Sequence, residues 1–285
     1  MNLTQDALKI DANLTVTRLK RFIDDYVQKV GAKGVAVAVS GGIDSCTTAA
    51  LSALAIGGNK ITALYMPEEE TYSSREAKHA KQVADKFKFN LETIDITPIF
   101  QALCKVLPIY DEHDKLSRGN LKARTRMICL YYYANHLGEI VCGSSDKSET
   151  MMGYFTKWGD VASDISPLMD LYKTQVRSMA AHIGIPKEII SKPSTPQLWP
   201  GQLAEQELGI RYETLDLILL GLENFMSNEE IAEQLKVKTE FIKRIKNRWL
   251  ASEHKRRPPL TLKQEFRTIG SDFRLPYTPS FTRRD

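Results

Sequence analysis

The chain has 285 residues, of which 42% are hydrophobic and 26% charged, and its formal net charge is +4; this composition excludes an intrinsically disordered protein. Its apolar runs all fall short of the roughly 18 residues that cross a membrane, and residues 1–13 lack the apolar stretch of a signal peptide, so we expect a cytoplasmic protein. The length suits one large α/β domain or two small ones.

Strands and helices alternate in the first half of the chain. Residues 14–30 carry apolar side chains at helical spacing, and Gly31 is a suitable stop. Residues 34–39 are apolar on both faces, which is typical of a buried parallel strand. We expect further strands over 61–65, 91–96 and 140–142, and helices over 46–56, 74–87 and 120–137. This alternation predicts an α/β fold: a doubly wound, mostly parallel, Rossmann-like sheet with helices on both faces.

The pattern changes after Pro193. Residues 194–202 are rich in Pro, Gly, Ser and Thr and predict a loop, while residues 212–225 and 228–250 predict helices. We therefore expect a helical C-terminal portion. Our expectation is a single domain over residues 1–260, with the tail 261–285 packing on that domain or on a partner subunit.

The sequence SGGIDS at residues 40–45 directly follows the strand predicted at 34–39 and opens a helix. Its two glycines allow a sharp turn, and the free amides at the helix start favour an anion. The Lys of a Walker A loop is absent. Asp44 would repel a phosphate unless a cation intervened, which indicates a bound Mg²⁺. An ordinary exposed turn is the alternative, but ligands of such sheets lie at the carboxyl ends of strands, where this loop is predicted.

Charged and aromatic residues gather in two later segments. Within the basic segment 118–127, Arg118, Lys122 and Arg126 share one helical face, whereas Arg124 points elsewhere. Residues 153–160, GYFTKWGD, interleave three aromatics with a Lys and an Asp. Aromatic faces stack on flat rings, and Lys pairs with phosphate or carboxylate. A solvated basic face and a core patch are the alternatives for the two segments.

The SGGIDS loop resembles the pyrophosphate loop of the N-type ATP pyrophosphatases, which split ATP between its α and β phosphates and adenylate a substrate oxygen. Five further motifs resemble the NAD synthetase family in order and spacing, over roughly residues 20–258. They are GNLKARTRM (119–127), GSSDKSE (143–149), GYFTKWGD (153–160), DISPLMDLYK (164–173) and SEHKR (252–256). The resemblance implies an adenine nucleotide alpha hydrolase-like fold.

The resemblance also implies a role for individual residues. ATP would be bound by Ala38, Val39, Ser40, Gly41, Gly42, Ile43, Asp44, Ser45, Ser144, Lys173 and Thr195. Deamido-NAD would be bound by Arg124, Phe155, Lys157, Asp164, His254 and Lys255. Asp44 and Glu149 would hold Mg²⁺, and Lys173 and Asp164 would be catalytic. Ser144 stands where the family usually has Thr, a difference that keeps the hydroxyl.

The activity implied by the resemblance is the ATP-dependent amidation of deamido-NAD (nicotinic acid adenine dinucleotide) by ammonia. It yields NAD, AMP and pyrophosphate through an acyl adenylate, as the last step of NAD biosynthesis. ATP is then a co-substrate, Mg²⁺ the cofactor and a homodimer the expected assembly. Because water would hydrolyse the adenylate, the pocket must close, and residues 194–202 are the candidate lid.

Free ammonia is the nitrogen source that we expect. Family members that use glutamine carry an additional amidase domain, which is long enough to fold as a separate unit. The pyrophosphate loop begins at Ser40 here, after one predicted helix, which leaves no room for that domain. A separate subunit that supplies ammonia is the alternative.

Two other functions stay open at this point. A tRNA-modifying pyrophosphatase would share the loop, but such enzymes generally need reactive, often paired cysteines, and the four cysteines here form no CxxC pair. A helix-turn-helix nucleic-acid-binding protein would explain residues 227–245 and the basic segment 236–267, whose net charge is +8. The turn at 236–238 lacks Gly, and the ATP motifs have no role in such a protein. We therefore expect neither nucleic acid nor a membrane as a partner.

Overall fold

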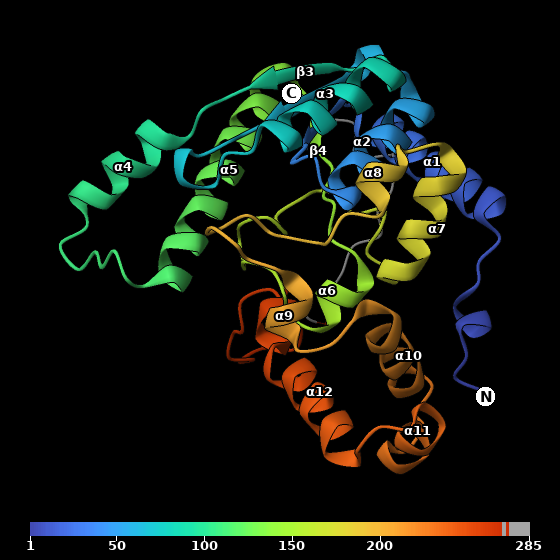
Figure 1. Ribbon diagram of the computed structural model, residues 1–285. Helices are drawn as coiled ribbons and strands as arrows, with labels where there is room; N and C mark the ends of the chain where they lie inside the picture. The colour runs from blue at the N-terminus through green and yellow to red at the C-terminus, as the bar shows by residue number, and fades with distance from the viewer. Residues whose placement is uncertain (270–271, 274–285) are drawn as a thin grey trace.

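A four-stranded parallel sheet forms the centre of the computed structural model, which describes residues 1–269 and 272–273 (Figure 1). Its strand order is β3-β2-β1-β4, with all pairs parallel, and Val35 pairs with both Ile61 and Ile140. The strands are β1 (Val35–Ala38), β2 (Ile61–Tyr65), β3 (Asn90–Thr93) and β4 (Ile140–Val141). The predicted doubly wound parallel sheet is confirmed.

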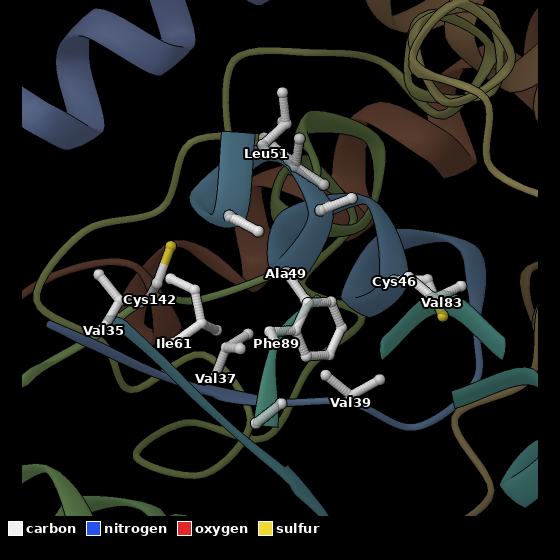
Figure 2. Packing of buried hydrophobic residues seen from close by; sticks show 14 of the residues in the cluster. Val35, Val37, Val39, Cys46, Ala49, Leu51, Ile61, Val83, Phe89 and Cys142 are labelled. Atoms are coloured by element: carbon white, nitrogen blue, oxygen red, sulfur yellow. The ribbon is translucent and has the colours of Figure 1, made fainter. Parts of the chain in front are cut away.

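Helices cover both faces of this sheet. Along β1, Val35 and Val37 belong to one hydrophobic cluster and Ala36 to another, as the two-residue period of a strand requires. Figure 2 shows the valines of β1 on the side of α2 that carries Ala49, with Leu51 on the opposite side of that helix. The helices on the valine face are α1 (Ala12–Val30), α2 (Ile43–Ile56), α3 (Ser74–Phe87) and α7 (Lys173–Ile183), while α5 (Lys115–Leu137) covers the alanine face.

Several predicted elements differ from the structure. The helical region 228–250 is divided into α11 (Asn228–Leu235) and α12 (Thr239–Ala251), because Lys236 adopts a left-handed φ of 55°. The break falls in the turn 236–238 of the helix-turn-helix pattern. The strand expected to reach residue 96 ends at Thr93. Elements that were not predicted from the sequence are α4 (Thr97–Val106), α6 (Lys147–Met151), α7, α8 (Lys187–Ile190), α9 (Ala204–Leu208) and the 3₁₀ turns η1 (Gln5–Leu8), η2 (Gly58–Lys60), η3 (Glu69–Thr71) and η4 (Glu253–Lys255).

The C-terminal helices gather below the sheet in Figure 1 and have a hydrophobic cluster of their own. This cluster joins α10 (Tyr212–Glu223), α11 and α12 to Leu3 and Leu8 of the N-terminal segment. The fully buried Asp216 of α10 also accepts hydrogen bonds from the hydroxyls of Ser148 and Thr174, at 2.6 and 2.7 Å. These contacts support our proposal that residues 1–260 form one domain.

The described part of the tail is largely exposed. Leu262, Phe266 and Ile269 are each about 80% exposed or more. The predicted packing of the remaining tail lies outside the described residues. Among the helices that the structure describes, none combines the length and hydropathy that a membrane span requires.

Replacing Leu51 by Ala should destabilise the fold. The side chain of Leu51 is fully buried in the hydrophobic cluster on the valine face of the sheet, so its truncation leaves a cavity and should lower the free energy of unfolding by about 3 kcal/mol. Leu54 lies on the same helix but is 40% exposed, and Leu54→Ala should cost less than about 1 kcal/mol. Urea unfolding followed by circular dichroism measures both, and equal losses would contradict this packing.

Candidate active site

A cavity of about 810 Å³ lies at the carboxyl edge of the sheet. Its lining combines the loop after β1 with residues from α5, from the segment after β4, from residues 192–207 and from η4. The predicted site residues among its lining are Ala38, Val39, Ser40, Gly42, Ile43, Asp44, Ser45, Arg124, Ser144, Glu149, Phe155, Lys157, Thr195, His254 and Lys255. Segments far apart in the sequence thus meet at one cavity.

The pyrophosphate loop (residues 40–45) is held in shape by its own hydroxyls. The backbone N–H of Ser40 donates to Ser45 Oγ at 3.1 Å, and the N–H of Gly42 donates to Ser40 Oγ at 3.2 Å. Gly41 has a φ of +82°, and a Cβ on it would lie 2.4 Å from the carbonyl oxygen of Glu76. The loop therefore requires glycine at position 41 both for its backbone conformation and for its close contact with α3.

Beside this loop lies an acid–lysine cluster of Lys173, Asp44, Asp146 and Glu149. The ammonium of Lys173 is within 2.7 Å of Asp44 Oδ2, 2.7 Å of Asp146 Oδ2 and 2.9 Å of Glu149 Oε1. The side chains of Lys173 and Asp146 are fully buried, whereas those of Asp44 and Glu149 are about one-fifth exposed and line the cavity. Lys173, which is buried, thus contacts both of the acids that line the cavity.

The pKa values in this cluster follow from burial and mutual charge. Burial raises the pKa of both Glu149 and Asp146, and the neighbouring carboxylates add to the rise while Lys173 opposes it. Burial alone would lower the pKa of Lys173, but the charges of Asp146, Asp44 and Glu149 hold it well above its ordinary value. Lys173 therefore stays a cation.

Asp146 is the member of this cluster that sequence reasoning missed. It is the N-cap of α6, where its carboxylate accepts a hydrogen bond from the backbone N–H of Glu149 at 2.8 Å. An Asp three residues before a Glu at the start of a helix is a capping pattern, so the sequence did hold a signal for its position. The same turn points Glu149 toward Lys173.

The cluster has the donor set of a divalent-cation site. Oxygens from Asp44, Asp146 and Glu149 lie within 4.8 Å of one another, and the buried Asp44 Oδ1 has no hydrogen-bond partner among the described residues. With all three carboxylates ionised, Lys173 cancels one charge and leaves a formal charge of −2. Carboxylate oxygens are the ligands that Mg²⁺ prefers, so these residues fit that ion.

The opposite side of the cavity has a cationic edge, formed by Arg124, Lys157, His254 and Lys255. Lys255 Nζ donates to the carbonyls of Gly153 and Phe155, and it lies 4.7 Å from the centroid of the Phe155 ring. Lys157 Nζ donates to the carbonyl of His254 at 2.6 Å, and Arg124 donates to the carbonyl of Lys157 at 3.1 Å.

These contacts fix the segment 153–157 against η4 without neutralising the lysines. Within the described part of the chain, neither Lys157 nor Lys255 has a carboxylate within ion-pair distance. Burial lowers the pKa of Lys255, which means that its charge is poorly solvated. An anionic ligand at this edge would therefore find cations that are already positioned.

Gly41, Lys173 and Asp164 are the predicted residues that do not line the cavity. Gly41 and Lys173 lie directly behind it, in the loop and in the cluster. Asp164 is exposed, and its carboxylate accepts a hydrogen bond from the backbone N–H of Val141 at 2.7 Å. In this structure Asp164 therefore contacts the backbone of β4 and does not line the cavity.

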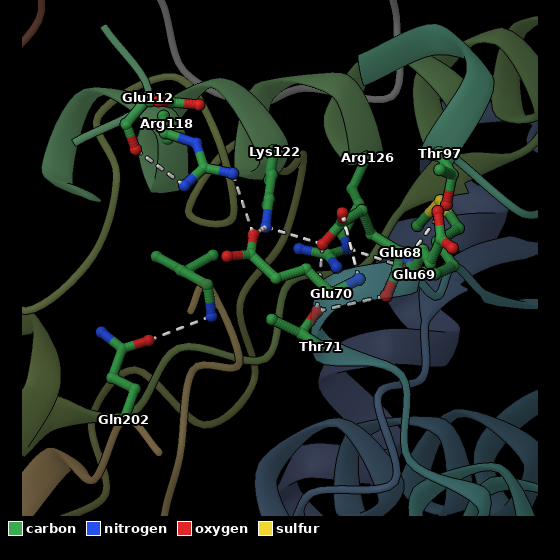
Figure 3. A network of polar contacts seen from close by, with 12 residues as sticks. Glu68, Glu69, Glu70, Thr71, Thr97, Glu112, Arg118, Lys122, Arg126 and Gln202 are labelled. Atoms are coloured by element: carbon green, nitrogen blue, oxygen red, sulfur yellow. Dashed lines mark hydrogen bonds and ion pairs between the residues drawn. The ribbon is translucent and has the colours of Figure 1, made fainter. Parts of the chain in front are cut away.

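The basic face of α5 is confirmed as one face, but acids that the sequence analysis did not single out neutralise it (Figure 3). Lys122 is fully buried, and its ammonium lies 2.6 Å from both Glu68 Oε2 and Glu70 Oε2. Arg118 also contacts Glu70, at 3.1 Å, and Arg126 Nε donates to a backbone carbonyl in the same loop. These contacts hold the loop after β2 at the rim of the cavity.

Residues 194–202, the predicted loop and candidate lid, border the cavity, and we call them the lid segment. They contain no helix or strand, and most of them line the cavity. A Cβ on Gly119 of α5 would lie 3.0 Å from Leu198 Cβ and 3.1 Å from the Trp199 ring. The lid segment therefore rests directly on the backbone of α5, at a position where an added Cβ would require Leu198 and Trp199 to shift.

A parallel sheet that carries its glycine loop at the carboxyl edge of a central strand belongs to the Rossmann-like class of α/β proteins, which bind nucleotides at that edge. Comparisons with known proteins narrow this class. The family model described as NAD synthase matches residues 15–259, and the chain belongs to that family. The family resemblance of the sequence motifs is thereby confirmed.

Individual relatives agree with this assignment. The NH(3)-dependent NAD(+) synthetase of Hyperthermus butylicus is 42% identical over 255 residues, which cover 89% of this chain and 92% of that protein. Among solved structures, NMN synthetase from Francisella tularensis has a TM-score of 0.78 and 30% identity, covering 89% of this chain and 99% of that one. NH3-dependent NAD synthetase from Campylobacter jejuni has a TM-score of 0.75 and 27% identity, covering 90% and 100%.

Replacing Lys173 by Met should destabilise the chain. It removes the cation shared by three carboxylates, of which Asp146 is fully buried, and should lower the free energy of unfolding by about 3–5 kcal/mol. Lys147→Met is the matched control, because the partners of Lys147, Asp170 and Glu223, are well exposed, and its cost should stay below about 1 kcal/mol. Similar unfolding midpoints in urea for both variants would argue against this account.

Proposed function

We propose that this chain catalyses the ATP-dependent amidation of deamido-NAD by ammonia, forming NAD, AMP and pyrophosphate. The observation that carries the proposal is the meeting of the pyrophosphate loop, the acid–lysine cluster and the cationic edge at one cavity. A nucleoside triphosphate with its cation fits the pyrophosphate loop and the acid–lysine cluster, and an anionic dinucleotide fits the cationic edge. The names of the relatives support the same reaction.

At the ATP side, the proposal assigns the phosphates to the amides and hydroxyls of residues 38–45, with further contacts from Ser144, Lys173 and Thr195. Asp44 and Glu149 would hold Mg²⁺, with Asp146 beneath them. When bound, this ion would supply positive charge that offsets the charge of the triphosphate. Lys173 offsets the repulsion between the two lining carboxylates and fixes their direction.

At the other side, Arg124, Lys157, His254 and Lys255 would bind the phosphates and carboxylate of deamido-NAD, and Phe155 would contact a flat ring. Asp164 is the residue for which the cavity offers the least support, because it is exposed. We propose a homodimer in which deamido-NAD binds near the subunit interface, so that Asp164 can orient it.

The chemistry follows from charge. An oxygen of the pyridine carboxylate attacks the α-phosphorus of ATP, a P–O bond to the carboxylate forms, and the bond to pyrophosphate breaks. The amides of the pyrophosphate loop would stabilise the charge that develops on the phosphates, and Lys173 would act through the carboxylates that it holds in place. Ammonia then attacks the activated carbonyl carbon, loses a proton, and AMP leaves with the C–O bond electrons. The lid segment would exclude the water that competes with ammonia.

The two alternatives of the sequence analysis find little support in the side chains. Burial raises the pKa of Cys46 and of Cys142 to about 12, which makes them poor nucleophiles for thiol transfer. In the helix-turn-helix segment, α12 buries Ile242 and Ile245 in the C-terminal cluster, and its Arg248 donates to the carbonyl of Met152 and lines the cavity. We place this ligase, which forms a C–N bond, in the cytoplasm.

The structural comparison also favours a second candidate acceptor for the amidation. The likeness to NMN synthetase from Francisella tularensis, with its TM-score of 0.78, favours nicotinic acid mononucleotide as a second candidate acceptor. It carries the same pyridine carboxylate and one phosphate group in place of a dinucleotide. The same cavity and the same adenylation would serve both substrates.

Incubating the protein with deamido-NAD, Mg-ATP and ammonium should produce NAD, AMP and pyrophosphate in equal amounts. A parallel reaction replaces deamido-NAD with nicotinic acid mononucleotide, and the ratio of kcat/KM values identifies the preferred acceptor. We expect deamido-NAD to be preferred, because its sequence relatives at about 40% identity are named NAD synthetases. A folded protein that forms neither amide would refute the proposal.

Asp44→Asn is the control for this assay. Asn keeps the shape of the side chain but removes one carboxylate charge from the proposed Mg²⁺ site, so NAD formation should fall about 100-fold or more. The variant should melt within a few degrees of the wild type, because Asp44 is partly exposed. Unchanged turnover would remove Asp44 from the proposed metal site.

Gly119→Ala should uncouple ATP cleavage from amidation. The new methyl group would push Leu198 and Trp199 away from α5, admit water and let the adenylate hydrolyse. The ratio of AMP to NAD should therefore rise several-fold above one, and Gly119→Val should raise it further. Lys115→Ala, an exposed change one turn earlier on the same helix, should leave the ratio at one. A ratio of one in both Gly119 variants would show that the lid contact is dispensable.

A further inference from the structure

Lys192 lies behind the pyrophosphate loop and has no role in the assignments above. It follows α8, and its side chain is 6% exposed. Its ammonium donates to the carbonyl of Gly41 at 3.0 Å and forms an ion pair with Glu76, whose side chain is 3% exposed. Lys192 also contributes to the lining of the cavity. One buried cation thus connects the loop, α3 and the start of the lid segment.

Glu76 makes a compensating cation necessary at this place. Its backbone and carboxylate lie so close to Gly41 that a Cβ there would be 2.4 and 2.8 Å away from them. An unpaired carboxylate directly behind the loop would oppose the negative charge of a triphosphate in front of it, and burial would weaken the screening by water. The ammonium of Lys192 cancels this charge.

The contact with Gly41 also fixes the direction of a peptide group. Because a peptide is planar and trans, the carbonyl of Gly41 and the N–H of Gly42 point to opposite sides. Lys192 holds the carbonyl behind the loop, and the N–H of Gly42 then lies on the side of Ser40 Oγ, to which it donates. Without this contact, the flexible Gly41–Gly42 peptide could present its carbonyl oxygen to the phosphates.

We propose that Lys192 is a positioning residue for the ATP triphosphate, acting through the Gly41 carbonyl and the Glu76 carboxylate. The inference rests on the proposed use of ATP and adds a residue outside the pyrophosphate loop and the acid–lysine cluster. Lys192 is three residues before Thr195, so binding of ATP at the loop and placement of the lid segment share one anchor. Its effect should concern ATP and leave deamido-NAD binding unchanged.

The test compares Lys192→Met, Lys192→Arg and the double variant Lys192→Met/Glu76→Gln. Calorimetry with Mg-ATP alone measures binding, and steady-state assays give KM for each substrate. Lys192→Met should weaken Mg-ATP binding about tenfold or more, as expected for losing a charged hydrogen bond, with KM for deamido-NAD within about twofold. Lys187→Met, an exposed change on α8, should leave both values as in the wild type.

The double variant separates positioning from a merely structural role. It removes both charges of the buried pair, so it should fold even if Lys192→Met does not. Mg-ATP binding should recover in part, because the charge of Glu76 is gone while the Gly41 carbonyl still lacks its donor. Lys192→Arg should bind within about threefold of the wild type. The proposal is overturned if Lys192→Met binds Mg-ATP like the wild type, or if the double variant binds no better than Lys192→Met.

Calorimetry also separates this proposal from the proposed function. A wild type that binds Mg-ATP but forms no amide would refute the amidation, while the Lys192 comparison would still be decided by binding. A wild type that forms NAD, together with a Lys192→Met variant of equal ATP affinity, would refute the role of Lys192 alone.

Discussion

The ion pairs of Lys173 with three carboxylates connect the parts of this structure that form its cavity. Asp44 comes from the start of α2, Asp146 and Glu149 from α6, and Lys173 from the first turn of α7. Removing charges from water is costly unless each is paired, so these helix ends are held together by more than hydrophobic contact. The position of the pyrophosphate loop relative to the segment after β4 depends on this cluster.

The same helix ends carry the C-terminal portion to the cavity. The backbone N–H of Lys173 donates to Ser148 Oγ, and Ser148 in turn donates to the buried Asp216 of α10. Through α10 the C-terminal cluster is fixed relative to α6, and α12 then leads to η4 at the cationic edge. A hydrogen-bond chain that begins beside the loop thus determines where His254 and Lys255 lie.

Local patterns were sufficient to predict the sheet and the glycine loop, and most of the site residues that the family resemblance implies do line the cavity. The strand at 34–39 and the SGGIDS turn are contiguous, so their relation needs no knowledge of tertiary contacts. The partners of buried charges could not be predicted in this way. Glu68 pairs with Lys122, and Glu76 with Lys192, across 54 and 116 residues of sequence, and an isolated acid in a sequence is more often a surface residue. The turn at Lys236 has no glycine, and only the helix-turn-helix pattern of residues 227–245 indicated it.

The pyrophosphate loop is thus held from both sides by a buried lysine, Lys173 below Asp44 and Lys192 behind Gly41. Lys173 contacts three carboxylates and Lys192 contacts one. These four carboxylates and two ammonium groups carry a formal charge of −2 when all are ionised. The side chains around the loop therefore do not attract a triphosphate by their net charge. Attraction must come from backbone amides and from a cation that enters with the nucleotide. Buried lysines at this site keep the loop rigid and its acids directed, and the positive charge that meets the phosphates is supplied with the substrate.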